Sequence, residues 1–328
     1  MQRQEKTLKS TRSTGAKSDI SLESKTSREF KDERIDYLYR AYRLGTMRAA
    51  SESLDIAPSS ISRHIASLEE ELGIELIERG RHVVRLTAAG ARVLEYYRDR
   101  ASQRETLLTE LDDLKGLRSG HLDVAIGTGL LRTIFAEALA SFSKRYSQIS
   151  ISVRSLSSRE IIPLVAEDEC YFGVVMGPTG DPRVRVISSF SQPTCLICRP
   201  EHELAGRPSI SLDELAGHRI ILPDIGFRVR QQLAEIQEQT GRRIPVVMTS
   251  NSIQTILDCV VANLGATVLS VTSVPEHLTK SDLVAVPIDD PLLQASRVQI
   301  IKRNGRRLPA SALALIETLE HLLRNATP

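Results

Sequence analysis

The stretch that most constrains this chain is Met47 to Ala66, MRAASESLDIAPSSISRHIA, which reads as a short helix, a tight turn and a second helix. Pro58 suits the first turn of the second helix, because the N–H that proline lacks would have no partner there. Apolar residues then recur at the helical period, namely Ile61, Ile65, Leu68 and Leu72. The pattern predicts a helix-turn-helix, and an ordinary helical hairpin with a solvated face is the alternative.

The opposite side of the second helix carries short polar side chains and one arginine, with no acidic neighbour. These residues are Ser59, Ser60, Ser62, Arg63 and His64. Hydroxyl and guanidinium groups of this kind contact phosphates and base edges in a DNA major groove. We therefore expect this side of the helix to bind DNA.

Basic residues gather again between Glu75 and Leu86, a stretch that reads as a small hairpin turning at Gly80. The basic side chains expected to contact DNA are Arg79, Arg81 and Arg85. A basic hairpin beside a helix-turn-helix is a wing, and its arginines would meet the DNA backbone or the minor groove.

A long helix is predicted from Thr87 to about Gly116. Its residues at alternating spacings of three and four form an imperfect heptad seam: Leu94, Tyr97, Ala101, Arg104, Leu108, Leu111 and Lys115. A helix of this length needs another surface on which to bury its stripe. We interpret it as a dimerisation helix, and packing against its own domain is the alternative.

From Gly120 onwards, strand-like and helix-like segments alternate, beginning with the apolar strand His121–Gly127 and the amphipathic helix Thr133–Tyr146. This order predicts an α/β domain whose parallel sheet is covered by helices on both faces. Cys195 and Cys198 form a C-x-x-C within a predicted strand, where residues three apart face opposite sides. We expect core cysteines; a functional cysteine pair is the alternative.

Composition and motifs exclude several classes of protein. The 328 residues are 41% hydrophobic and carry a net charge of +2, which suits two or three globular domains and requires any basic surface to be local. No run approaches the roughly 18 apolar residues of a membrane span, and the polar N-terminus is unlike a secretory signal. We expect a cytoplasmic protein with no membrane partner. Without nucleotide, metal or hydrolase motifs, we expect no enzyme, no metal and no cofactor.

With these residues in view, the chain resembles the LysR family of bacterial transcriptional regulators over about residues 33 to 323. The matching blocks are Ala49 to Leu54, Ser59 to Ile65, Leu68 to Gly73, Arg85 to Gly90, Gly120 to Gly127, Pro200 to Ala205 and Asn263 to Ala266. The chain departs from the family pattern in three places. Ile77 replaces a usual Phe, His64 replaces a common Gln, and Pro58 comes one residue early.

The resemblance implies a winged helix-turn-helix at 32–90, a linker and dimerisation helix at 88–118, and a periplasmic-binding-protein-like effector domain. One lobe of that domain would comprise 120–177 and 271–328, and the other 178–270. Residues 1–31 are predicted to be a disordered basic extension, with a phosphate-seeking arm as the alternative. The implied partners are double-stranded promoter DNA, a small-molecule effector and further copies of the chain, as a homodimer or homotetramer. RNA polymerase is a further candidate partner.

Polar loops before predicted helices are the candidate effector site. They contribute Thr128, Gly129, Ser157, Ser250, Asn251 and Ser252, and Arg228 would add a charge. Hydroxyls and free backbone N–H groups at a helix start favour an anion, so we expect a small carboxylate-bearing metabolite. Ordinary helix N-caps are the alternative. A DNA-binding protein without a ligand, or an enzyme built on the binding-protein fold, are the alternative functions.

Overall fold

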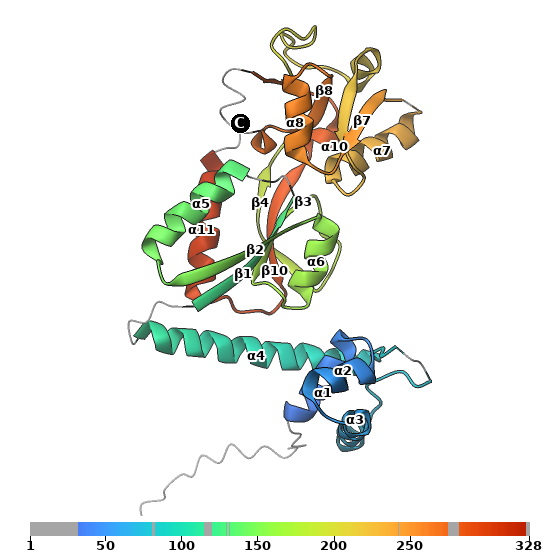
Figure 1. The fold of residues 1–328 in the computed structure, drawn as a ribbon, viewed down its shortest axis with the longest axis vertical. Coiled ribbons are helices and arrows are strands. Elements are labelled where there is room, and N and C mark those ends of the chain that lie inside the picture. The colour runs from blue at the N-terminus through green and yellow to red at the C-terminus, as the bar shows by residue number, and fades with distance from the viewer. Residues whose placement is uncertain are drawn as a thin grey trace, which may run out of the picture. The chain divides into compact units, whose positions relative to one another are not determined.

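The computed structural model describes residues 32–80, 83–114, 120–128, 130, 132–241, 243–274 and 282–325. The predicted extension at residues 1–31 lies outside this part of the chain. The chain divides into two compact units, residues 1–97 and 98–328 (Figure 1).

Three short helices form the centre of the first unit: α1 (Asp32–Arg43), α2 (Met47–Leu54) and α3 (Pro58–Leu72). Thr46 caps α2, because its hydroxyl accepts a hydrogen bond of 3.0 Å from the Ala49 N–H. Asp55 then takes a left-handed conformation, with φ of 53°, which ends α2 and starts the turn. The predicted helix-turn-helix is confirmed.

The apolar stripe of α3 forms the core of this unit. Its buried members are Ile61, Ile65 and Leu68, which pack with residues of α1. The wing follows, with an antiparallel bridge between Ile77 and Leu86. The Glu69 carboxylate of α3 accepts hydrogen bonds from the backbone N–H groups of Leu76 (2.7 Å) and Ile77 (3.2 Å), which fixes the wing to the helix.

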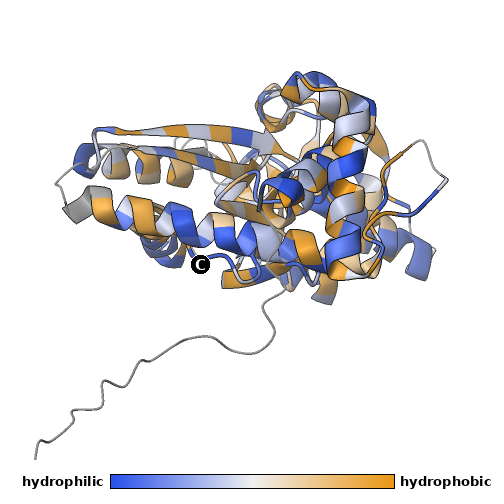
Figure 2. Ribbon diagram, turned by 90° about the horizontal axis from the view of Figure 1, so that it is seen from below, coloured by the Kyte–Doolittle hydropathy of each residue, from blue (hydrophilic) through white to orange (hydrophobic). Residues whose placement is uncertain are grey.

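Helix α4 (Ala88–Leu114) is the predicted long helix, and its apolar seam is divided between two environments. Leu94 is buried in the core of the first unit, where Tyr97 also packs and donates a hydrogen bond of 2.8 Å to Asp36. Leu108 and Leu111 are exposed, and Figure 2 shows orange, hydrophobic segments alternating with hydrophilic ones along this part of α4. The first part of the predicted seam is therefore used within its own domain.

The second unit contains two five-stranded sheets. The first has the order β2-β1-β3-β10-β4, and its strands are β1 (Gly120–Gly127), β2 (Ile149–Leu156), β3 (Phe172–Met176), β4 (Val184–Ser191) and β10 (Arg297–Arg303). The second has the order β7-β6-β8-β5-β9, and its strands are β5 (Thr194–Cys198), β6 (Ile220–Pro223), β7 (Val246–Ser250), β8 (Ala266–Ser270) and β9 (Val284–Pro287). Strand β1 runs parallel to β2 and β3, and β6 runs parallel to β7 and β8.

Helices cover both faces of each sheet, as the alternating pattern predicts. The first sheet packs against α5 (Arg132–Arg145) and α11 (Ala310–Asn325) on one face and α6 (Ser158–Ala166) on the other (Figure 1). The second sheet packs against α7 (Arg228–Thr240) and the short α10 (Pro291–Gln294) on one face, and against α8 (Ile253–Val261) on the other. Two short 3₁₀ turns complete this unit, η1 (Leu212–Gly217) and η2 (Val271–Ser273).

The predicted lobe boundaries were wrong in two places. Strand β4, expected in the second lobe, pairs with β10 from Arg297–Ser191 to Arg303–Val184 and so belongs to the first sheet. Strand β9, expected in the first lobe, pairs with β5 of the second sheet. The chain passes between the lobes beside Gln192 and Ser296, whose backbones are joined by a hydrogen bond of 2.9 Å. The segment after Gly177, where the second lobe was expected to begin, is instead a loop within the first lobe.

The later part of α4 is fastened to the first lobe by a buried ion network. Arg303 of β10 pairs with Asp99 of α4 and with Asp168, each at 2.6 Å. Arg306 pairs with Asp168 at 2.8 Å and with Glu105 of α4 at 3.1 Å. The two arginine side chains are only 5% and 6% exposed and Asp168 is 17% exposed, whereas Asp99 and Glu105 are 38% and 40% exposed. The pairs with Asp168 are therefore largely shielded from water, and the pairs with α4 are partly hydrated. Packing of this helix on its own domain, the alternative interpretation, is therefore present in this segment.

Candidate DNA-binding surface and effector pocket

The exposed side of α3 carries the first part of the predicted DNA-binding set. Ser59, Ser62 and Arg63 are exposed, and their spacing of three and four residues places them on one face of the helix. Ser60 is half-buried beside this face. Ile61 and Ile65 hold the helix from the other side, so the core fixes which side chains point outward.

His64 has a packing contact that the sequence did not reveal. Its ring stacks on the ring of Tyr37 of α1, with centroids 4.5 Å apart and an angle of 13° between the planes. The imidazole is half-buried at the margin of the polar face. His64 therefore joins α1 to α3 in addition to the DNA contact that we predicted.

The wing arginines differ in their surroundings. Arg79 forms an exposed ion pair with Glu75 at 2.9 Å, and such a pair is weak enough to be exchanged for a phosphate. Arg85 is exposed on the returning strand of the hairpin. Arg81 lies outside the described residues. Arg48, a further basic residue of α2, pairs with Glu52 at 3.0 Å.

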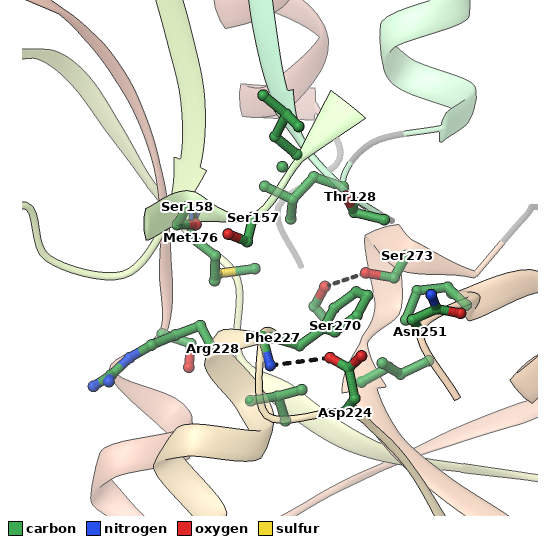
Figure 3. A pocket seen from close by; sticks show the side chains of 18 of the residues that line it. Thr128, Ser157, Ser158, Met176, Asp224, Phe227, Arg228, Asn251, Ser270 and Ser273 are labelled. Atoms are coloured by element: carbon green, nitrogen blue, oxygen red, sulfur yellow. Dashed lines mark hydrogen bonds between the residues drawn. The ribbon is translucent and has the colours of Figure 1, made fainter. Parts of the chain in front are cut away.

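A cavity of about 360 Å³ lies between the two sheets of the second unit. Residues at the carboxyl ends of parallel strands from both sheets contribute to its wall: Gly127, Thr128, Leu156, Ser157, Met176, Asp224, Asn251 and Ser270. Ligands in open α/β sheets bind at such strand ends, because loops and helix starts converge there. Figure 3 shows the pocket with Ser157, Ser158 and Met176 on one side and Asp224, Phe227 and Asn251 on the other.

Four of the predicted effector residues line this cavity: Thr128, Ser157, Arg228 and Asn251. Ser157 also caps α6, in a capping box where its backbone N–H donates to Glu160 at 2.9 Å. Gly129 lies outside the described residues.

Ser250 and Ser252 are not among the residues that line the cavity. The Ser252 hydroxyl accepts from the Thr255 N–H at 3.2 Å, and the Ser250 hydroxyl accepts from the Ser252 N–H at 3.1 Å. Ser252 is therefore the N-cap of α8, as the alternative interpretation expects, and the hydroxyl of Ser250, the last residue of β7, supports the turn before that cap.

Arg228 lines the cavity, but its charge is used elsewhere. Its guanidinium pairs with Glu235 of the same helix at 2.9 Å, and Figure 3 shows it directed away from Ser157 and Ser158. The side-chain carbons of Arg228 lie against Gly177 of the first lobe. A Cβ added to Gly177 would lie 3.1 Å from the Cδ atom of Arg228. The residue thus bridges the lobes, and the positive charge that we expected for an anion is offset.

Several pocket residues escaped the sequence interpretation. Gln232 and Ser296 form a buried polar pair in the cavity wall, with the Gln232 side-chain N–H₂ donating to the Ser296 hydroxyl at 3.0 Å. Asp224 directly follows the buried strand β6, so the rule that sites form at strand ends could have identified it. Gln232 lies inside α7, where only the tertiary structure shows which way it points.

The cysteines of the C-x-x-C occupy opposite faces of β5. Cys195 packs with α8 and Cys198 with the α7 side of the sheet. Burial raises the pKa of each thiol to about 11, which keeps both protonated near neutral pH. Among the described residues, no group of three or more His, Cys, Asp and Glu side chains could hold a metal ion, and no helix could cross a membrane.

Comparison with known proteins covers nearly the whole chain. The protein-family model described as "Bacterial regulatory helix-turn-helix protein, lysR family" matches residues 33–91. A second family model, "LysR substrate binding domain", matches residues 115–324. The RuBisCO operon transcriptional regulator of Allochromatium vinosum is 28% identical over 271 residues, which is 82% of this chain and 88% of that protein. The HTH-type transcriptional activator CmpR of Synechocystis is 25% identical over 280 residues, or 84% and 90% of the two chains.

Solved structures show the same fold. Full-length OxyR of Pseudomonas aeruginosa superposes with a TM-score of 0.63 at 20% identity, covering 90% of this chain and 95% of that one. The regulatory domain of CcmR from Synechocystis, solved in complex with 2-PG, gives a TM-score of 0.56 at 19% identity and covers 64% of this chain and 100% of that one.

Proposed function

The chain belongs to the LysR family of bacterial transcriptional regulators, and we propose that it binds an interrupted palindrome in promoter DNA through α3 and the wing. It is a DNA-binding regulator with an effector-binding domain and not an enzyme. The observation that supports the proposed surface is the exposed set Ser59, Ser62 and Arg63 on a helix whose opposite face is fixed by the core. A bidentate contact of Arg63 with a guanine would contribute roughly 1–3 kcal/mol of base discrimination.

The wing would contribute affinity without base selectivity. Arg79 and Arg85 are exposed and would contact phosphates, and Arg81, between them in sequence, is proposed for the same role. Contacts with phosphates carry no sequence information and weaken with salt.

A small metabolite in the cavity between the lobes is the proposed signal. The lining residues come from both lobes, so a ligand that touches both would favour one closure angle over others. A ligand shifts such an equilibrium only by its difference in affinity between the two states. CcmR, a structural relative, has a regulatory domain that was solved with a small molecule, 2-PG.

Assembly through α4 is the proposed route to a homodimer or homotetramer. The exposed stripe consists of Leu107, Leu108 and Leu111, with exposed fractions of 53%, 54% and 42%. Full burial of an exposed leucine side chain contributes about 1.5–3 kcal/mol, and these half-exposed side chains would gain roughly half of that each, so a second α4 is a suitable partner. Contact with RNA polymerase and a cytoplasmic location are proposed from the regulator's role.

A DNase footprint on the DNA upstream of the protein's own coding region tests the proposed DNA-binding surface. We expect wild-type protein to protect a discrete site containing an interrupted palindrome, and Arg63→Ala to lose it. Arg92→Ala is the matched control, because Arg92 is an exposed arginine on α4 that pairs only weakly with Glu95. A footprint that Arg63→Ala leaves unchanged would show that α3 is not the recognition helix.

A further inference from the structure

The charged groups around the cavity do not suit an anion. Two carboxylates, of Asp224 and Glu160, belong to its lining. Arg228 is the one basic side chain among the described lining residues, and its ion pair with Glu235 offsets its charge. An anionic ligand would be repelled by the Asp224 carboxylate in the cavity wall and, more weakly, by the exposed Glu160 carboxylate at its margin.

Asp224 is held with its carboxylate towards the cavity. Its backbone N–H donates to the Ser250 carbonyl at 3.1 Å, and its carbonyl accepts from the Phe227 N–H at 3.2 Å. One carboxylate oxygen, Oδ1, accepts from the Gly226 N–H at 3.0 Å. The other oxygen makes no hydrogen bond with the described residues. Figure 3 shows this carboxylate beside Phe227, Ser270 and Asn251.

Glu160 adds a second negative charge at the margin of the cavity on the first lobe. The Ser157 hydroxyl, and then the Ser157 backbone N–H, donate to its carboxylate and lower its pKa. Glu160 therefore stays ionised at any pH near neutral. The other hydroxyls of this wall, those of Thr128, Ser155 and Ser158, are neutral and accept or donate hydrogen bonds.

We infer that the effector carries an ammonium group, which binds the Asp224 carboxylate, while its uncharged part faces the hydroxyls and apolar side chains of the cavity. This inference rests on the proposed function of the cavity and replaces the carboxylate-bearing metabolite that the sequence suggested. An ammonium group supplies three donors, and a charged donor to a carboxylate gives one of the stronger hydrogen bonds in proteins. The cavity volume of about 360 Å³ suits a small metabolite.

Calorimetry on the full-length protein with a matched series of ligands tests this inference. The probes are three hydroxylated alkyl chains of about five carbons, which end in an ammonium, a hydroxyl or a carboxylate, together with 2-PG, the small molecule bound to the regulatory domain of CcmR. We expect the ammonium compound to bind at least about tenfold more tightly than the others. Asp224→Asn keeps an oxygen that can accept from the Gly226 N–H, so the turn is preserved while the charge is removed.

The Asp224→Asn variant should bind the ammonium compound about tenfold more weakly than wild type. Asp289→Asn is the control, since Asp289 is exposed and outside the cavity lining, and it should bind as wild type does. Equal or tighter binding of the carboxylate compound or of 2-PG, no binding of the ammonium compound, or an unchanged affinity in Asp224→Asn would each overturn the inference. A carboxylate that binds and changes the footprint would leave the proposed function standing. An ammonium ligand that binds without altering DNA binding would contradict the proposed function alone.

Discussion

Gly90 has no Cβ, and this allows the wing and α4 to approach each other closely. An added Cβ at this position would lie 2.0 Å from the Leu76 carbonyl oxygen and 3.2 Å from a Leu86 side-chain carbon. Thr87 holds the same junction, because its hydroxyl donates to the Glu75 carbonyl at 2.7 Å and accepts from the Gly90 N–H at 3.1 Å. The backbone of the wing therefore approaches the helix too closely for any side chain.

We predict that Gly90→Ala destabilises the DNA-binding unit by about 1–3 kcal/mol, because the wing must move away from the helix. Thermal unfolding of the full-length protein would measure the change, with Gly217→Ala as the control. Gly217 has no atom within 4 Å of its ideal Cβ position, so that substitution should have little effect. Equal stability of the two variants would contradict the close approach.

His202 gives the second lobe a dependence on pH. Burial, and then the nearby charge of His218, lower the pKa of His202 below its ordinary value of about 6.5. The two rings lie with centroids 4.8 Å apart, and the Nδ1 atom of His202 accepts from the Leu204 N–H at 3.2 Å. Between the lowered pKa and about 6.5 the unfolded chain binds more protons than the folded one, so acidification favours unfolding.

We predict that the free energy of unfolding falls as the pH drops below about 6.5, and that the fall ends below the pKa of the folded state. His202→Asn keeps an acceptor for the Leu204 N–H but cannot titrate, so its urea midpoint should change less over the same pH range. If the urea midpoint of His202→Asn falls with decreasing pH as steeply as that of wild type, groups other than His202 cause the loss of stability.

The attachment of α4 to its effector domain depends on buried charges contributed by separate elements. Asp99 and Glu105 lie on α4, Arg303 ends β10, and Asp168 follows α6. Arg306 also lies over the Tyr171 ring, with 4.5 Å between the guanidinium carbon and the ring centroid. Of the three carboxylates only Asp168 is largely buried, at 17% exposed, whereas Asp99 and Glu105 are 38% and 40% exposed. Loss of an arginine is therefore most costly at Asp168, because a buried charge that loses a partner cannot be fully hydrated.

We predict that Arg303→Met destabilises the effector unit by about 2 kcal/mol, because Asp168 keeps only Arg306 as a partner while Asp99, 38% exposed, can be hydrated. Arg324→Met is the matched control, because the side chain of Arg324 is 67% exposed and pairs with Glu320 on the surface of α11. Urea unfolding followed on the effector unit would separate the two variants. A loss in Arg303→Met no larger than in the control would show that the network is weakly coupled to folding.

At the scale of the whole molecule, we expect the exposed leucines at the end of α4 to determine how many copies of the chain associate. We predict that Leu108→Glu combined with Leu111→Glu lowers the assembly to a smaller species, because two charged side chains would replace the apolar contact. Light scattering coupled to size-exclusion chromatography would measure the mass. Leu313→Glu alters a leucine of similar exposure, 46%, on α11 and should leave the mass unchanged. An unchanged mass in the double variant would locate the interface elsewhere.

Local features of the sequence were sufficient for the elements and for the family. Helical spacing of Ile61, Ile65 and Leu68 identified α3 and its buried side, because periodicity depends only on nearby residues. The alternation of strands and helices likewise predicted an α/β domain, and the resemblance to the family implied its two lobes. Blocks such as Arg85 to Gly90 carried the resemblance to the LysR family.

Only the tertiary structure decided how distant segments meet. The sequence could not show that β4 pairs with β10 or β9 with β5, because strand pairing joins residues about a hundred positions apart. From the sequence we expected the guanidinium of Arg228 to supply a positive charge to the effector site. In the folded chain this guanidinium pairs with Glu235, and Asp224 contributes a carboxylate to the wall of the cavity. Residue types and their spacing are local, but the direction of a side chain and its partners depend on packing between elements.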